Sequence, residues 1–223
     1  KASIRTNVKK VIALSTDKAT NPVNLYGASK LASDKIFIAA NHLSGKSNSK
    51  FSVVRYGNVL GSRGSVVPHF INLIKKNVKA LPITDTKMTR FWITLNDGVD
   101  FVTSSLAMMI GGELFIPKIP SMKIVDLAKT LAPNLPHEVI GVRPGEKIHE
   151  LMITTDDAEN TLELNDRYIV QPSLSFWDNN CDAYKNVKKV SSNFIYSSET
   201  NEKWLTEASL KIMLKEYEIE FQK

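Results

Sequence analysis

Residues 11–30 of the chain, VIALSTDKATNPVNLYGASK, decide its fold class. Val11 to Ser15 is a short apolar run that ends in a polar cluster, which predicts a buried strand. Asn21-Pro22 separates this strand from the next element. From Tyr26 to His42 the apolar residues recur with helical period. A buried strand followed by a helix is the repeating unit of α/β folds, so this stretch predicts that class.

The same alternation continues along the chain. We expect strands or extended segments at residues 51–56, 82–84, 88–93, 112–117 and 138–142, and helices at residues 66–77, 95–109, 122–131 and 204–217. We also expect Ser121 to cap the helix that follows it, a turn at RPGEK (143–147) that leads into 148–152, and a long polar loop at 178–192. Strands that alternate with helices predict a parallel sheet.

Composition excludes several classes of protein. The 223 residues carry a formal charge of +6, and 43% are hydrophobic and 23% charged, which is close to the globular average and excludes a collagen, a coiled coil or a disordered chain. A single cysteine, Cys181, excludes a disulfide framework, and the four scattered histidines lead us to expect no metal. The sequence pI of 9.2 could mark a nucleic-acid surface. The lysines are scattered, however, so we interpret the charge as a solvated face and expect no nucleic-acid partner. No apolar run has the length of a membrane helix, so we expect no membrane partner.

The polar residues of the opening block form a chemical constellation. Tyr26 and Lys30 are four residues apart, so on a helix their Cβ atoms lie about 5–6 Å apart on one face. A cation there would stabilise a phenolate and make the tyrosine a usable base. Asp17 and Lys18 follow the predicted strand, where open α/β sheets place ligand groups. Tyr-x-x-x-Lys alone also occurs by chance in helices, but the whole block favours a catalytic site.

A glycine-rich phosphate turn is missing from the sequence. A doubly wound nucleotide-binding sheet begins with a strand, G-x-G-x-x-G and a helix. The nearest candidates, Gly57, Gly61 and Gly64, have the wrong spacing and follow a later strand. We therefore expect the chain to be the later part of a larger protein, with a companion N-terminal segment that supplies the first strands.

Six motifs carry a resemblance to a known family. They are STDKATNPVNLYGASK (15–30), RYGNVLGSRGSVVP (55–68), PITD (82–85), MTRFWIT (88–94), GGELFIPKIPSMK (111–123) and RPGEKIHE (143–150). Together they resemble the extended short-chain dehydrogenase/reductase superfamily, and within it the soluble inverting UDP-N-acetylglucosamine 4,6-dehydratases of pseudaminic acid biosynthesis. Asp17-Lys18 together with Tyr26 resembles this branch, because C5-retaining relatives carry Asp-Glu and many membrane-anchored ones carry Met at the tyrosine position.

The resemblance implies an NADP-dependent dehydration of UDP-N-acetylglucosamine. Tyr26 would take the C4 hydroxyl proton while C4 hydride passes to NADP, and Lys30 would hold the nicotinamide ribose. Lys18 would remove the C5 proton, and Asp17 would protonate the departing C6 hydroxyl. The residues alone leave open how acid and base are divided between Asp17 and Lys18.

Further positions receive roles from the resemblance. Asn58 resembles a substrate-binding asparagine, and Val66 and Thr84 resemble residues that line the nucleotide-sugar pocket, with plain packing as their alternative. Arg143 resembles the arginine that clamps the UDP diphosphate, with a surface ion pair to Glu146 as its alternative. One further segment resembles the one that wraps the nicotinamide end of NADP, and its alternative is an ordinary tight loop. It comprises Val59, Leu60, Gly61, Ser62 and Arg63.

The resemblance also implies an organisation and a setting. Residues 1–60 would be the later part of an NADP-binding Rossmann domain. Residues 61–223 would be mostly a smaller α/β substrate-binding subdomain, with some segments returning to the Rossmann sheet. Family members of this branch are cytoplasmic homo-oligomers, often hexamers, that feed flagellin glycosylation in bacteria. Two other functions stay open, a cofactor-poor binding or regulatory relative and a dehydratase or epimerase acting on another nucleotide sugar.

Overall fold

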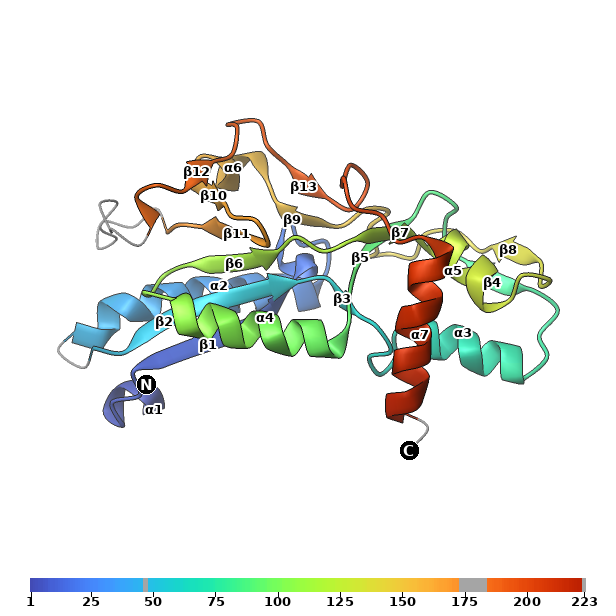
Figure 1. Ribbon diagram of the computed structural model, residues 1–223, viewed down its shortest axis with the longest axis horizontal. Helices are drawn as coiled ribbons and strands as arrows, with labels where there is room; N and C mark the ends of the chain where they lie inside the picture. Colours follow the sequence, from blue (N-terminus) through green and yellow to red (C-terminus); the bar gives the residue numbers. More distant parts are fainter. Residues whose placement is uncertain (46–47, 173–183, 222–223) are drawn as a thin grey trace. The chain divides into compact units, whose positions relative to one another are not determined.

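The computed structural model describes residues 1–45, 48–172 and 184–221. Part of the loop predicted at residues 178–192, and Cys181 with it, lies outside this description. The chain divides into two compact units (Figure 1). The first unit comprises Lys1–Tyr56, Val99–Lys118 and Leu151–Tyr196, and the second comprises Gly57–Gly98, Ile119–Glu150 and Ser197–Lys223.

The first unit is built on a six-stranded mixed sheet in the order β1-β2-β6-β11-β10-β12. The first three strands in this order are parallel, β11 runs antiparallel to β6, and β10 is antiparallel to both β11 and β12. Ser15 of β1 pairs with Arg55 of β2, which aligns the carboxyl ends of these two strands. The strands are β1 (Lys10–Thr16), β2 (Lys50–Tyr56), β6 (Leu114–Pro117), β10 (Thr161–Glu163), β11 (Arg167–Val170) and β12 (Lys188–Lys189).

Two helices, α2 (Leu25–Ser44) and α4 (Leu95–Met108), cover opposite faces of this sheet (Figure 1). Successive side chains of a strand point to opposite faces. Val54 of β2 joins a core with Phe101 of α4, whereas its neighbour Arg55 reaches Asp34 of α2. The residues of β2 from Phe51 to Arg55 are therefore buried throughout. The shorter elements of this unit are α1 (Ala2–Arg5), η1 (Asp17–Ala19), β9 (Leu151–Ile153) and α6 (Thr155–Ala158), and β13 (Tyr196–Ser197) pairs with β9 where the chain leaves the unit.

The second unit packs three helices around two small sheets. Strand β5 lies between β3, which is parallel to it, and β7, which is antiparallel, while β4 and β8 form a parallel pair. The core joins Trp92, Phe70, Leu127 and Leu210, which are fully buried or nearly so. The elements are β3 (Asn58–Val59), β4 (Leu81–Ile83), β5 (Thr89–Ile93), β7 (Ser121–Lys123), β8 (His137–Val139), α3 (Val66–Lys75), α5 (Ile124–Leu131) and α7 (Glu207–Phe221).

The α/β class and the Rossmann-like parallel strands are confirmed, but two local predictions are wrong. Ser121 does not cap a helix, because it lies in β7, pairs with Phe91 and leaves Lys123 as the N-cap of α5. Trp204 precedes the last helix, since its backbone bridges to Ser121. The antiparallel strands after residue 155 are too short to leave a period in the sequence. Within the described residues, the helices include none with the length and hydropathy to cross a membrane.

Candidate active site

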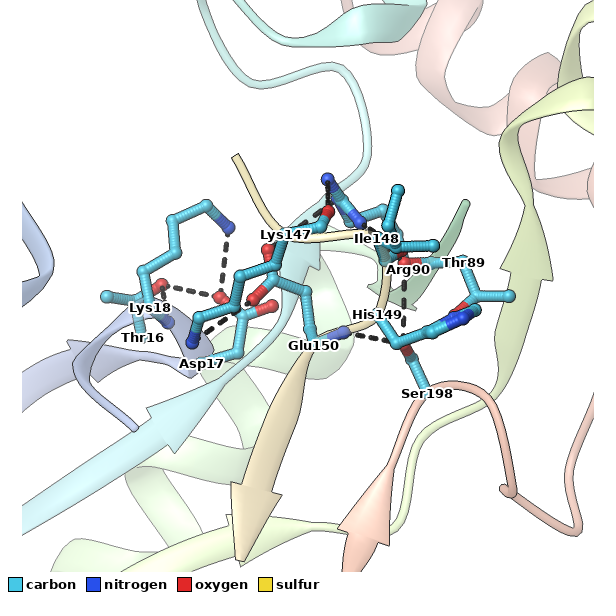
Figure 2. A network of polar contacts seen from close by, with 10 residues as sticks. All are labelled: Thr16, Asp17, Lys18, Thr89, Arg90, Lys147, Ile148, His149, Glu150 and Ser198. Atoms are coloured by element: carbon cyan, nitrogen blue, oxygen red, sulfur yellow. Dashed lines mark hydrogen bonds and ion pairs between the residues drawn. The ribbon is translucent and has the colours of Figure 1, made fainter. Parts of the chain in front are cut away.

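The turn that follows β1 holds two of the predicted catalytic residues. Asp17 opens the 3-10 turn η1 and is fully buried. Its Oδ1 accepts hydrogen bonds from Thr16 Oγ1 at 2.8 Å and Lys18 Nζ at 3.0 Å (Figure 2). Its Oδ2 is also buried and has no hydrogen-bond partner among the described residues. A carboxyl group with one oxygen held and the other without a partner is suited to exchange a proton with a bound molecule.

The first turn of α2 packs directly against this pair. Asn24 caps the helix by accepting a hydrogen bond from the Gly27 backbone at 2.8 Å. A Cβ atom built on Gly27 would lie 2.3 Å from the carbonyl oxygen of Lys18, so only glycine permits this approach. Tyr26, the residue before Gly27, is 53% exposed. Lys30 lies one turn further and donates a hydrogen bond to the Leu14 carbonyl at 3.3 Å.

A second tyrosine belongs to the same neighbourhood. Tyr56 ends β2, and both its burial and the nearby charge of Tyr26 raise the pKa of its phenol. A negative charge on Tyr26 therefore disfavours ionisation of the Tyr56 phenol. Sequence analysis did not single out Tyr56, although it pairs with Thr16 across the parallel ladder and so lies beside the turn that begins at Asp17.

The residues predicted to bind cofactor and substrate between 58 and 84 lie in the second unit. Asn58 and Val59 form β3 beside β5, and Leu60 donates its backbone N–H to the Ile93 carbonyl at 2.9 Å. Gly61 has a φ of 73°, which permits the tight turn that exposes Ser62 and Arg63. Of the remaining two, Val66 begins α3 and packs on the core, and Thr84 follows β4 and is partly buried.

Arg143 also lies in the second unit, on an exposed loop. Its side chain is 64% exposed and stands 3.7 Å from Glu146, so the ion pair of the alternative interpretation is present. Exposed pairs of this kind contribute little to stability, and the guanidinium stays available for another anion. Gly145, with a φ of 82°, forms the turn between these two residues.

The chain after this loop is anchored by a buried polar network (Figure 2). Arg90 donates hydrogen bonds to the carbonyls of Ile148 at 3.0 Å and Lys147 at 2.9 Å, and its Nε lies 3.6 Å from the buried carboxylate of Glu150. Ser198 accepts a hydrogen bond from the Glu150 backbone at 2.9 Å. These contacts hold the C-terminal end of RPGEKIHE in place, and no sequence pattern predicted them.

The first unit thus contains all three predicted catalytic residues and Lys30, and the second contains the other predicted binding residues. The described ranges contain no cluster of three His, Cys, Asp or Glu side chains suited to a metal ion. The half-exposed phenol of Tyr26 and the ammonium of Lys30 fit the nicotinamide-ribose end of a dinucleotide, because both can hydrogen-bond a ribose hydroxyl. A glycine motif for the pyrophosphate is absent from the sequence.

The chain is similar to known proteins in sequence and in structure. The chain is 58% identical over 214 residues to a UDP-N-acetylglucosamine 4,6-dehydratase (inverting) of Campylobacter jejuni, covering 94% of this chain and 64% of that protein. It is 42% identical over 171 residues to a UDP-glucose 4-epimerase of Rickettsia rickettsii, covering 75% of this chain and 50% of that one. Among solved structures, Pen from Bacillus thuringiensis matches with a TM-score of 0.82 at 33% identity, over 96% of this chain and 64% of that chain.

These similarities confirm the predicted resemblance to sugar-nucleotide dehydratases. The chain spans less than two thirds of the length of these relatives. A family model described as "Polysaccharide biosynthesis protein" matches residues 1–172. Because that match extends over most of the sequence, the chain belongs to this family of polysaccharide biosynthesis proteins.

Proposed function

We propose that this chain carries the catalytic residues of a nicotinamide-dependent UDP-N-acetylglucosamine 4,6-dehydratase that inverts C5. The observation that carries the proposal is the Asp17–Lys18 pair, which lies directly under the first turn of the helix that bears Tyr26. An acid, an amine and a phenol in one place are the three proton-transfer groups that this dehydration needs. The identity to the Campylobacter enzyme supports the substrate.

Each group has a distinct step. When bound, a nicotinamide cofactor would accept hydride from C4 and return it to C6. Tyr26 removes the proton of the C4 hydroxyl, and the ketone so formed acidifies the C5 hydrogen. Lys18 removes the C5 proton, while Asp17 protonates the C6 hydroxyl, which leaves as water. A proton that comes from solvent is then added to C5 on the opposite face, so the product differs from the substrate by one water and by the C5 configuration.

The buried position of Asp17 supports its role as acid. Its Oδ1 is engaged by Thr16 and Lys18, which leaves Oδ2 to face a reacting hydroxyl. Lys18 is 35% exposed, so its amine can reach solvent and substrate. For the diphosphate, the exposed fork of Arg143 offers paired donors of the kind that phosphate oxygens accept.

The test is proton NMR of UDP-N-acetylglucosamine in heavy water with purified protein and NADP. Both this chain and the longest natural form of the protein would be assayed. We expect a 4-keto-6-deoxy product with deuterium at C5 and an inverted C5 coupling pattern. Lys18→Ala should abolish the product, whereas Lys129→Ala, at an exposed position of α5, should not. A product epimerised at C4 that keeps its C6 hydroxyl would instead make the protein an epimerase.

The finer parts of the proposal go beyond the reaction. Four points stay predictions. They are the use of NADP rather than NAD, a role at the start of pseudaminic acid synthesis for flagellin, a hexameric homo-oligomer in the cytoplasm, and a companion N-terminal segment. Binding of NADP without turnover of any nucleotide sugar would favour another substrate. Absence of cofactor binding by the longest natural form would favour the regulatory relative.

A further inference from the structure

Helix α2 carries a third polar residue, Asp34, in line with Tyr26 and Lys30, for which a function is predicted. Tyr26, Lys30 and Asp34 follow each other at intervals of four residues, so they lie along one side of the helix. Asp34 stands about 12 Å beyond Tyr26 along the axis, at roughly 1.5 Å per residue. The burial of this side rises along the helix, since Tyr26 is 53% exposed and Asp34 only 3%.

Asp34 is held by a buried arginine of the neighbouring strand. Arg55 of β2 donates from Nη2 to Asp34 Oδ2 at 3.1 Å and from Nη1 to the Met152 carbonyl of β9 at 3.0 Å. Both side chains of the ion pair are about 5% exposed or less. Arg55 pairs in register with Ser15, two residues before Asp17. The Arg55 guanidinium therefore connects α2 and β9 to β2, the strand that pairs with β1 beside the turn of Asp17.

Beyond Asp34, the next contact that holds α2 is the Asn41 amide, which donates to the Phe51 carbonyl at 2.8 Å and accepts from the Phe51 backbone N–H at 3.0 Å. Gly27 and Asp34 are the buried positions reported for the helix, and they flank Lys30 on either side. Leu31, Lys35 and Ile38 border a pocket of about 630 Å³, which Asp34 and Arg55 also line. A helix without a deeply buried apolar stripe depends on specific contacts for its position. Buried ion pairs contribute little net stability but can specify geometry.

We infer that Asp34 and Arg55 are positioning residues, which set the placement of Tyr26 and Lys30 over the Asp17–Lys18 turn. Gly27 fixes the start of α2 against the Lys18 carbonyl, and the Asp34–Arg55 pair fixes it two turns later. Without the ion pair, α2 keeps the Gly27 contact at its start and the Asn41 hydrogen bonds near its end, and the turns between them, which carry Lys30, can shift. The inference rests on the proposed function, in which Lys30 holds the cofactor ribose and Tyr26 is the base.

The test compares Asp34→Asn with Glu163→Gln in the longest natural form of the protein. Asp34→Asn keeps the size of the side chain and removes the charge that Arg55 binds. We expect kcat to fall about tenfold or more, because displacements near 1 Å have effects of this order. KM for the sugar nucleotide should stay within about twofold, since the altered groups act after substrate binding. Glu163→Gln breaks the Lys118–Glu163 pair at 2.8 Å in the same unit, away from α2, and should leave kcat unchanged.

Amide hydrogen exchange provides a readout that does not depend on turnover. Residues 26–34 should exchange faster in Asp34→Asn, while the amides of α4 keep their wild-type rates. A second variant, Asp34→Leu with Arg55→Met, replaces the ion pair by apolar groups. It distinguishes the effect of the pair on the position of α2 from its effect on the stability of the protein. We expect it to recover the melting temperature without recovering kcat. Recovery of both together, or wild-type kcat and exchange in Asp34→Asn, would overturn the inference. Wild-type protein without dehydratase activity would refute the proposed function, and the exchange data would still decide the inference.

Discussion

Replacing Gly27 by alanine tests the contact between α2 and the turn that holds Asp17 and Lys18. The added Cβ would lie 2.3 Å from the Lys18 carbonyl oxygen and 3.0 Å from Pro22 Cβ, whereas ordinary contact begins at 3.4 Å. The helix start or the turn must therefore retreat by about 1.1 Å, because a backbone oxygen cannot rotate away as a side-chain end can.

Two effects of opposite sign set the magnitude. Overpacking of this kind destabilises a protein by about 1–3 kcal/mol. Alanine favours a helix over glycine by about 0.5–1 kcal/mol, which offsets part of that loss. We expect a net destabilisation of about 1–2 kcal/mol, which corresponds to a fall of about 2–8 °C in melting temperature for a chain of this size. The displacement separates Tyr26 from the Asp17–Lys18 pair, so kcat should fall about 100-fold.

Gly98 provides the matched control. It also lies in the first turn of a helix, α4, and a Cβ there would meet nothing closer than Ile93 Cδ1 at 4.0 Å. Gly98→Ala should therefore raise the melting temperature slightly and leave the dehydration rate unchanged. Thermal unfolding and NMR product formation measure both variants. A Gly27→Ala protein with wild-type stability and rate would refute the close packing of α2 on the Lys18 carbonyl.

Three further predictions follow from the site and its surroundings. The pKa of the Tyr56 phenol is raised in the folded protein, so the stability that this group contributes is complete below about pH 10 and is lost as pH rises through the folded pKa. Tyr56→Phe should therefore reduce the loss of stability at alkaline pH. Urea unfolding at several pH values measures this difference. Arg90→Lys cannot reproduce the forked donation to the Lys147 and Ile148 carbonyls; we expect a several-fold higher KM for the nucleotide sugar in steady-state kinetics, and an unchanged KM would contradict this anchoring role. Arg143→Ala should weaken UDP binding about tenfold or more in calorimetry, since it removes a charge-assisted donor, while the exposed pair with Glu146 predicts little change in melting temperature.

The sequence predicted the elements whose patterns are local. The long helix of residues 26–42 is confirmed as α2, and the strand at residues 51–56 as β2, because both have clear periods and clear end signals. Ser121 was misassigned because its preference for helix caps is weaker than its pairing with Phe91 in the sheet. The division into a cofactor-binding and a substrate-binding domain at residue 60 stays a prediction.

The candidate site shows the same limit more sharply. Tyr26 and Lys30 could be paired from sequence because four residues on a helix determine their separation. Asp34 continues that series, yet its partner Arg55 lies on another strand, and only tertiary structure shows that they meet. Gly27 is unfavourable for a helix when judged by propensity alone, and the Lys18 carbonyl explains why it is there. Helix α2, which presents Tyr26 and Lys30, is held in part by a glycine contact and an ion pair, and neither contributes to the hydrophobic period from which helices are predicted. Positioning contacts should therefore be sought at residues that interrupt the hydrophobic period of a helix beside a reactive motif.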